Sequence, residues 1–321
     1  MIRMPRLSLD MPAIEVTDLH KRYGQIEALA GLTMSVGRGE VFGFLGPNGA
    51  GKTTTVKLLL GLARPTSGHG KILGAPLGDL KTRRKVGYLP ELFRYQPWLK
   101  AREVLTLHGE LMRMPRARRR PAADDALHLV GLADRAGDIV GKFSKGMQQR
   151  LGLGAALLGE PALVILDEPT SALDPLGRVD VRGIVRAAAD RGAAVFLNSH
   201  LLSEVEQVCD RIAIIDNGRV VASGQLDAVL GQAETQVRVT GISSSDLPAI
   251  ERFGPPTLEG DLLTVRPMDD AAVPDLVAQL VSMGGKVHEV RSGRSSLEQR
   301  FLELVARDRP PAGTPSAQVL R

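Results

Sequence analysis

Eight residues in the first part of the chain have the types and spacing needed to bind a chain of phosphates. They read Gly46-Pro47-Asn48-Gly49-Ala50-Gly51-Lys52-Thr53, the complete G-x-x-x-x-G-K-[ST] pattern. The glycines let the backbone turn tightly with its N–H groups facing inward, at the positive end of the next helix. Lys52 is then placed to reach the terminal phosphates, and the Thr53 hydroxyl to ligate Mg²⁺.

This loop stands between an apolar run and a helical pattern, the setting in which the motif has its meaning. Val41 to Leu45 predicts a buried strand, and Thr54 to Leu62 predicts the helix that follows it. Strand, loop and helix in this order bring the phosphates to a helix N-terminus, so Thr54 is counted with the nucleotide-binding residues. An ordinary glycine-rich turn is the alternative, and the flanking elements argue against it.

A second candidate for chemistry is a pair of acids that ends another apolar run. Ala162 to Leu166 predicts a strand buried on both faces of a parallel sheet, and Asp167 and Glu168 follow it. Ligands of such sheets bind beyond the carboxyl ends of the strands, where these acids fall. We expect Asp167 to hold Mg²⁺, directly or through water, and Glu168 to orient or deprotonate an attacking water. Without the phosphate-binding loop, a solvated acidic turn would be the better interpretation.

Three further stretches narrow the class of nucleotide enzyme. Phe143-Ser144-Lys145-Gly146-Met147-Gln148-Gln149-Arg150 opens a predicted helix before the acidic strand, and Ser171-Ala172-Leu173-Asp174 comes after it. His200, in Asn198-Ser199-His200, closes the next apolar strand, Ala193 to Leu197. In this order and spacing, roughly residues 13–232 resemble the nucleotide-binding subunit of ATP-binding cassette (ABC) transporters. No other P-loop family combines a serine-glycine signature helix, an Asp-Glu strand end and a following histidine.

The resemblance implies an α/β fold that combines the RecA-like mixed sheet core of P-loop NTPases, an antiparallel β subdomain and a helical subdomain at about residues 92–160. It also implies ATP and Mg²⁺ as cofactors. Alternating apolar residues in Ile14–Leu19 and Leu32–Val36 independently predict edge or antiparallel strands. In the family, the helical subdomain is the part that meets the membrane partner.

The resemblance also assigns roles residue by residue. Tyr23 falls at the adenine-stacking aromatic, where a ring offers a π face, although a half-buried tyrosine at a strand end is the plain alternative. Asp167 resembles the metal-supporting aspartate and Glu168 the general base. His200 resembles the switch histidine that contacts the γ-phosphate and aligns the attacking water. Ser144 and Gly146 would contact ATP held by the opposite subunit, and Asp174 belongs to the loop that couples the two sites.

Two positions depart from the family pattern. Glu91, after the predicted strand Val86–Pro90, stands where glutamine is usual; a carboxylate can still ligate Mg²⁺ and contact the water, but it adds negative charge beside the phosphates. The signature usually reads Leu-Ser-Gly-Gly-Gln, and here Lys145 replaces a glycine and can bring positive charge near the γ-phosphate. Both variants resemble the subgroup of bacterial exporters that pump drugs, antibiotics, lipids or polysaccharides.

Composition limits the remaining choices. No run of about 18 apolar residues occurs in the 321 residues, and the first residues lack the features of a signal peptide. The single cysteine, Cys209, excludes an internal disulfide and fits a reducing cytosol. Arginine clusters contribute to a net charge of +5, which indicates solvated faces or a contact with anionic lipid or an acidic partner. With aromatic residues at 3%, nucleic-acid binding is not expected.

The last third of the chain predicts a small α+β domain. A composition change near Gly231–Glu234 marks its start, so we expect an extension at 1–12, the nucleotide-binding domain at 13–232, an accessory domain at 233–307 and a disordered, proline-rich tail at 308–321. A capping box at Ser295-x-x-Glu298 predicts the start of the last helix. Its apolar stripe either docks onto the domain's own sheet or forms a dimer contact. The stripe consists of Leu297, Phe301, Leu304 and Val305.

The chain is therefore expected to be the ATP-hydrolysing subunit of an ABC exporter, cytoplasmic and peripheral on the inner face of the membrane. Two copies, most simply a homodimer, would hold two ATP molecules and drive a separate multi-span permease that selects the substrate. A soluble ABC-type ATPase of translation or DNA repair is the alternative; such proteins usually carry two cassettes or a long coiled-coil insert. A nucleotide kinase or GTPase has no use for the Ser144 signature.

Overall fold

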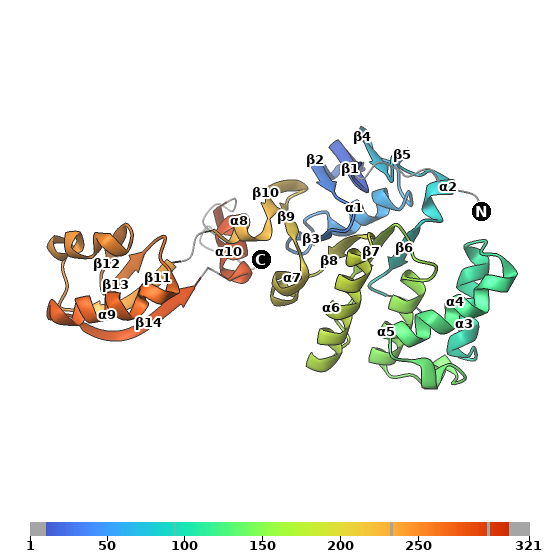
Figure 1. Ribbon diagram of the computed structural model, residues 1–321. Coiled ribbons are helices and arrows are strands. Elements are labelled where there is room, and N and C mark those ends of the chain that lie inside the picture. Colours follow the sequence, from blue (N-terminus) through green and yellow to red (C-terminus); the bar gives the residue numbers. More distant parts are fainter. Residues whose placement is uncertain (1–10, 93, 232–233, 294–295, 308–321) are drawn as a thin grey trace, which may run out of the picture. The chain divides into compact units, whose positions relative to one another are not determined.

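The structure is a computed structural model that describes residues 11–92, 94–231, 234–293 and 296–307 (Figure 1). The chain divides into two compact units, of which the first ends at Gln225 and the second begins at Leu226. The composition change in the sequence lies a few residues later, near Gly231–Glu234. Most of the expected N-terminal extension and all of the expected tail at 308–321 lie outside the described residues.

The first unit is built on a six-stranded sheet with the order β10-β9-β3-β8-β7-β6. Neighbouring strands are parallel, except that β10 pairs antiparallel with β9 through the hairpin at Asn217-Gly218. Both turn residues have positive φ, 46° and 74°, as a two-residue hairpin loop requires. The strands are β3 (Val41–Leu45), β6 (Val86–Leu89), β7 (Leu163–Asp167), β8 (Ala194–Asn198), β9 (Arg211–Asp216) and β10 (Arg219–Gln225).

A second, antiparallel sheet in this unit has the order β2-β1-β4-β5. It confirms the strands expected from the alternating pattern and extends both of them into a long hairpin with irregular register. Buried residues of both sheets form one apolar core, in which the Phe196 ring lies 6.1 Å from that of Phe42 and 5.2 Å from that of Phe44. The strands are β1 (Ile14–Tyr23), β2 (Ile26–Val36), β4 (Ser67–Ile72) and β5 (Ala75–Pro76).

Helices surround the six-stranded sheet and form the predicted helical segment (Figure 1). Within that segment α3, α4 and α5 pack together, and α5 also packs on β6. Between β8 and β9 the chain forms one further helix, α7. None of the described helices is both long and apolar enough to cross a bilayer. The helices are α1 (Lys52–Leu59), α2 (Leu80–Arg83), α3 (Ala101–Leu111), α4 (Arg116–Leu129), α5 (Lys145–Ala156), α6 (Pro175–Asp190) and α7 (Leu202–Val208).

The second unit contains an antiparallel sheet with the order β12-β13-β11-β14. Counted along the chain this is the order second, third, first, fourth, and the helical segment Ser244–Phe253 and α9 connect the strands as in a ferredoxin-like βαββαβ unit. Residues of the sheet and of these helices form a core of their own. The elements are α8 (Leu226–Leu230), β11 (Glu234–Thr240), β12 (Pro256–Glu259), β13 (Leu262–Val265), α9 (Val273–Ser282), β14 (Lys286–Gly293) and α10 (Leu297–Arg307).

The last helix, α10, starts one residue later than its capping box predicted. Ser296 Oγ accepts a hydrogen bond from the Gln299 N–H at 3.2 Å, and the Ser296 N–H donates to Gln299 Oε1 at 3.1 Å, so the box uses this pair; Ser295 lies outside the described residues. The helix contacts α8, where Arg300 Nε donates to the Val229 carbonyl at 3.1 Å. Among the described residues, the core of the small sheet includes none from α10, but two residues of the apolar stripe are buried, so the choice between docking and a dimer contact stays a prediction.

Candidate nucleotide site

The carboxyl ends of β3, β7 and β8 meet at one edge of the central sheet, because β8 pairs in parallel with both of the others. A cavity of about 480 Å³ opens at this edge and brings together most of the residues predicted to act on a nucleotide. It also includes Ile26, Glu27, Ala28 and Asn198, which the motifs did not indicate. The predicted residues that line it are Asn48, Gly49, Gly51, Lys52, Thr53, Thr54, Glu91, Asp167, Glu168 and His200.

Two positions of the phosphate-binding loop have a backbone geometry that only glycine allows. Gly51 has φ 108°, and a Cβ on it would lie 2.5 Å from the Ala28 carbonyl; a Cβ on Gly46 would lie 2.3 Å from the carbonyl of Ile215. The Ala50 N–H donates to the Pro47 carbonyl at 3.2 Å. Gly46, Pro47 and Ala50 therefore shape the loop from behind and do not line the cavity.

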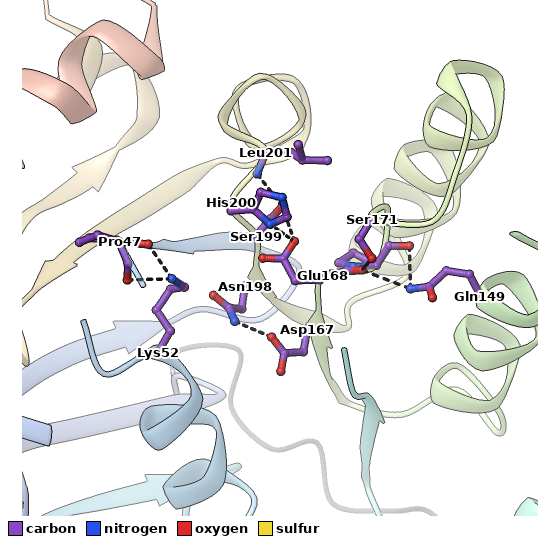
Figure 2. Close-up of polar contacts among 12 residues, drawn as sticks. Pro47, Lys52, Gln149, Asp167, Glu168, Ser171, Asn198, Ser199, His200 and Leu201 are labelled. Carbon is purple, nitrogen blue, oxygen red and sulfur yellow. Dashed lines mark hydrogen bonds and ion pairs between the residues drawn. The ribbon is translucent and has the colours of Figure 1, made fainter. Parts of the chain in front are cut away.

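Lys52, the first residue of α1, folds back onto this loop. Its Nζ donates to the carbonyls of Gly46 at 2.6 Å and Pro47 at 3.1 Å (Figure 2). Burial lowers the pKa of Lys52, and the nearby carboxylates of Glu168, Asp167 and Glu91 oppose that shift. A phosphate that entered the cavity would give this half-buried cation a charged partner in place of the two carbonyls.

Asp167 ends β7 with its carboxylate held from two sides. Asn198 Nδ2 donates to its Oδ1 at 2.5 Å, and the nearby main chain of Glu91 also favours the charged carboxylate. Burial raises the pKa of Asp167, while the bond from Asn198 acts in the opposite direction. A carboxylate fixed in this way is a ligand for a hard cation.

The donor set fits a Mg²⁺ ion that arrives with a nucleotide. Among the described residues, no group of three or more His, Cys, Asp or Glu could hold a metal by themselves. Mg²⁺ is usually held by one or two carboxylates together with substrate phosphates and water. The cavity offers oxygen donors of that kind from Thr53, Glu91 and Asp167.

The backbone of Glu168 is set by several hydrogen bonds. The residue has φ 55°, which is unusual for a side chain that carries a Cβ. Its N–H donates to the Asn198 carbonyl at 2.9 Å. Its own carbonyl accepts from Ser171 Oγ at 3.1 Å and from Gln149 Nε2 at 3.2 Å. The buried Gln149 thus ties the signature helix α5 to the end of β7.

The Glu168 side chain points toward His200 (Figure 2). Its Oε2 lies 2.8 Å from His200 Nδ1 and 3.4 Å from Ser199 Oγ, and it is 6% exposed as a residue. Burial raises the pKa of Glu168, and the neighbouring histidine acts against that rise. A buried carboxylate with a raised pKa is suited to accept a proton from water.

Ser144, Gly146 and Asp174 lie in a different pocket of the same unit, with a volume of about 570 Å³. Ser144 caps α5 by accepting a hydrogen bond from the Met147 N–H at 3.2 Å, and Asp174 caps α6 through the Gly177 N–H at 2.9 Å. Basic side chains surround this pocket. They are Arg135, Lys145 and Arg150.

Tyr23 is not among the residues that line the first cavity, but its partner in the β1–β2 pairing, Ile26, is one of them. It ends β1 and is 46% exposed, and Lys21 Nζ lies 4.7 Å from the centre of its ring. The exposed ring leaves an aromatic face available to a base.

Gln149, Asn198 and Ser199 stand within the motif stretches, but the sequence assigned them no role; in the structure they hold the catalytic candidates in place. One signal could have found Asn198. It is a polar residue at the end of an apolar strand, as Asp167 is. The pairing of their two strands, which puts them side by side, is visible only in the structure.

Comparison with known proteins shows which family the chain belongs to. Residues 29–171 match the family model described as ABC transporter. An uncharacterized ABC transporter ATP-binding protein of Nostoc sp. is 39% identical over 315 residues, which span 92% of this chain and 90% of the relative. A daunorubicin resistance ATP-binding protein of Streptomyces coeruleorubidus is 35% identical, over 92% of this chain and 97% of the relative.

A solved structure gives the same result for the fold. It is a dimeric ATP-binding cassette in a post-hydrolysis state with ADP and Pi, with a TM-score of 0.61 and 26% identity. The match covers 67% of this chain and 99% of that one. It therefore covers the expected sheet core and its subdomains and leaves an additional region of this chain unmatched. The chain belongs to the ATP-binding proteins of ABC transporters.

Proposed function

We propose that this ATP-hydrolysing subunit works as a homodimer in which each copy completes the nucleotide site of the other, and that the dimer powers an exporter. One observation supports this most directly. The phosphate-binding cavity and the pocket at Ser144 are separate cavities of the same unit. Each contains part of what a triphosphate needs: one has the loop and the acids, and the other has a helix N-terminus and basic side chains.

In this proposal Lys52 and the loop N–H groups bind the phosphates, while Thr53, Asp167 and Glu91 hold Mg²⁺. The ion, when bound, neutralises phosphate charge. Glu168 accepts a proton from the attacking water, and His200 orients Glu168 through the contact at 2.8 Å. Ser144 and the backbone of Gly146, at the N-terminus of α5, contribute donors to the γ-phosphate held by the other copy.

The remaining parts of the proposal concern the partner and the place of action. Large apolar side chains are exposed in the helical segment at 92–160: Leu92 is 87% exposed, Trp98 70% and Leu111 72%. Such residues suit a docking surface for a membrane permease on its cytoplasmic side. The relative named for daunorubicin resistance favours export of a toxic compound over import.

Replacing Glu168 with glutamine tests the catalytic assignment. Glu168→Gln keeps the size of the side chain but cannot take a proton, so turnover of Mg·ATP should fall by about 10²- to 10⁴-fold while ATP binding persists. With ATP bound and not hydrolysed, the variant should form a stable dimer on size exclusion. Glu259→Gln, a change of an exposed glutamate on β12, is the matched control and should behave as wild type.

Two results would contradict the proposal. Normal turnover by Glu168→Gln would remove Glu168 as the base, and a variant that binds ATP but stays monomeric would count against the shared site. The partner is tested by co-expression with a candidate multi-span permease, with which the chain should co-purify from membranes.

A further inference from the structure

Asn198 is the last residue of β8, and it lies directly opposite Asp167 in the parallel pairing of β8 with β7. Only 3% of its surface is exposed, and it lines the nucleotide cavity with Lys52 and Thr53. The other residues of β8, Ala194 to Leu197, are apolar and buried. A carboxamide at this position is costly to desolvate unless its polar atoms find partners.

The two ends of this carboxamide differ in their contacts. Nδ2 donates to Asp167 Oδ1 at 2.5 Å, a bond that can be followed in Figure 2. Oδ1 is buried and has no hydrogen-bond partner among the described residues. An unpaired buried acceptor costs about 1–3 kcal/mol, so native proteins keep one where something else completes it. The position of Asn198 on the cavity wall indicates that the missing donor comes from what the cavity binds.

We propose that Asn198 is a positioning residue for the divalent cation of the nucleotide site. Its Nδ2 fixes the Asp167 carboxylate, and its Oδ1 accepts a hydrogen bond from water that accompanies the cation. This inference rests on the Mg·ATP site proposed above. A neutral amide suits the task, because Asp167, Glu168 and Glu91 already place three carboxylates near Lys52 and a fourth acid would add repulsion.

The main chain of Asn198 has a separate role that substitution of the side chain leaves in place. Its carbonyl accepts from the Glu168 N–H at 2.9 Å. Changes of the side chain therefore remove the two amide contacts without removing the bond that sets the backbone of Glu168. Substitution of the side chain can therefore test the positioning role by itself.

The test measures metal affinity apart from turnover. Mn²⁺ replaces Mg²⁺ as a paramagnetic probe, and free Mn²⁺ is counted by electron paramagnetic resonance in the presence of ATP. Asn198→Leu removes both polar ends at similar size, whereas Asn198→Thr keeps a hydroxyl that can donate and accept. Asn217→Gly is the matched control: Asn217 Nδ2 also donates to an aspartate, Asp216 Oδ2 at 3.1 Å, but does not line the cavity.

Asn198→Leu should weaken Mn²⁺ binding by about 10- to 100-fold, the usual effect of removing an outer partner of a metal ligand. Asn198→Thr should lose less, and Asn217→Gly should match wild type. Affinity for ATP in EDTA, measured with a fluorescent nucleotide, should be unchanged in all of them. This difference between metal and nucleotide affinity is what a purely structural asparagine would not produce.

Three outcomes would overturn the inference while leaving the proposed nucleotide site in place. One is unchanged Mn²⁺ affinity in a folded Asn198→Leu. Another is an equal loss in the Leu and Thr variants, which would assign the effect to packing. A third is an equal loss of metal-free ATP affinity. If wild type itself binds no Mn²⁺ with ATP, the proposed nucleotide site fails, and the inference with it.

Discussion

Burial raises the pKa of Glu168 even though His200 Nδ1 lies 2.8 Å from its carboxylate. The desolvation of the charged form therefore outweighs the favourable contact with the histidine. A carboxyl group whose pKa is higher in the folded than in the unfolded chain favours folding when it is protonated. That contribution is lost as the pH rises through the folded-state pKa, so ionised Glu168 lowers the stability of the protein at neutral pH.

We therefore expect Glu168→Gln to be more stable than wild type at pH 7 to 8. The advantage should shrink as the pH falls through the folded-state pKa, and it should vanish below the ordinary pKa of a glutamate, because both states of the wild-type chain are then protonated. Thermal unfolding of the two proteins between pH 4 and pH 8, without nucleotide, measures this difference. A melting temperature of the variant that stays below wild type at pH 8 would show that the contact with His200 outweighs burial.

At this scale the sequence identified most of the cavity, because the phosphate loop and the Asp167-Glu168 pair are contiguous in the chain. The role of Asn198 was not predicted, because the sequence of one strand does not reveal which strand lies beside it. The start of α10 was predicted one residue too early for another reason. Ser295 and Ser296 each have a suitable acid or amide three residues later, Glu298 or Gln299, and pattern alone does not choose between them.

Among the elements, the contact between α5 and β6 joins the signature helix to the central sheet. Gly87 in β6 makes it possible, because a Cβ there would lie 1.8 Å from the carbonyl of Ala156 at the end of α5. The helical character of 92–160 was expected from the resemblance to the family. This close approach was not, because a glycine in a strand pattern has several possible causes.

Gly87→Ala should lower the free energy of unfolding by about 3 kcal/mol, because helix and strand must separate to make room. The matched change is Gly183→Ala on the exposed side of α6, where a Cβ meets nothing within 4 Å. That change should raise stability by about 0.5–1 kcal/mol through helix propensity. Urea unfolding of both variants measures the two effects. Equal stability of the two variants would show that α5 does not rest tightly on β6.

At the scale of the whole molecule, the two units have separate apolar cores. Composition predicted that a second unit exists and that it is α+β. It gave no information on the ferredoxin-like order of the strands. Strand order depends on long-range pairing, which local patterns do not contain.

A chain cut after Gln225 should remain folded and bind ATP within about twofold of the full chain, because the cavity lies wholly in the first unit. A chain cut after Gly231 retains α8 without α10, which contacts it in the full chain. It should therefore expose Val229 and Leu230 and aggregate more readily. Light scattering and nucleotide titration compare the two. Loss of ATP binding in the shorter chain would show that the units depend on each other.

The contact of α8 with α10 also bears on how such a chain can change over evolutionary time. Arg300 of α10 donates a hydrogen bond to the carbonyl of Val229 in α8. The chain segment between these two helices therefore begins and ends at points that lie close together. The ferredoxin-like sheet is thus the segment between two helices of the second unit that contact each other. Closing a longer or shorter segment between fixed ends changes the free energy only slightly. This segment can therefore be lengthened, shortened or exchanged for another fold while the ATPase cassette keeps its sequence. New binding functions of this protein are most easily acquired in that segment.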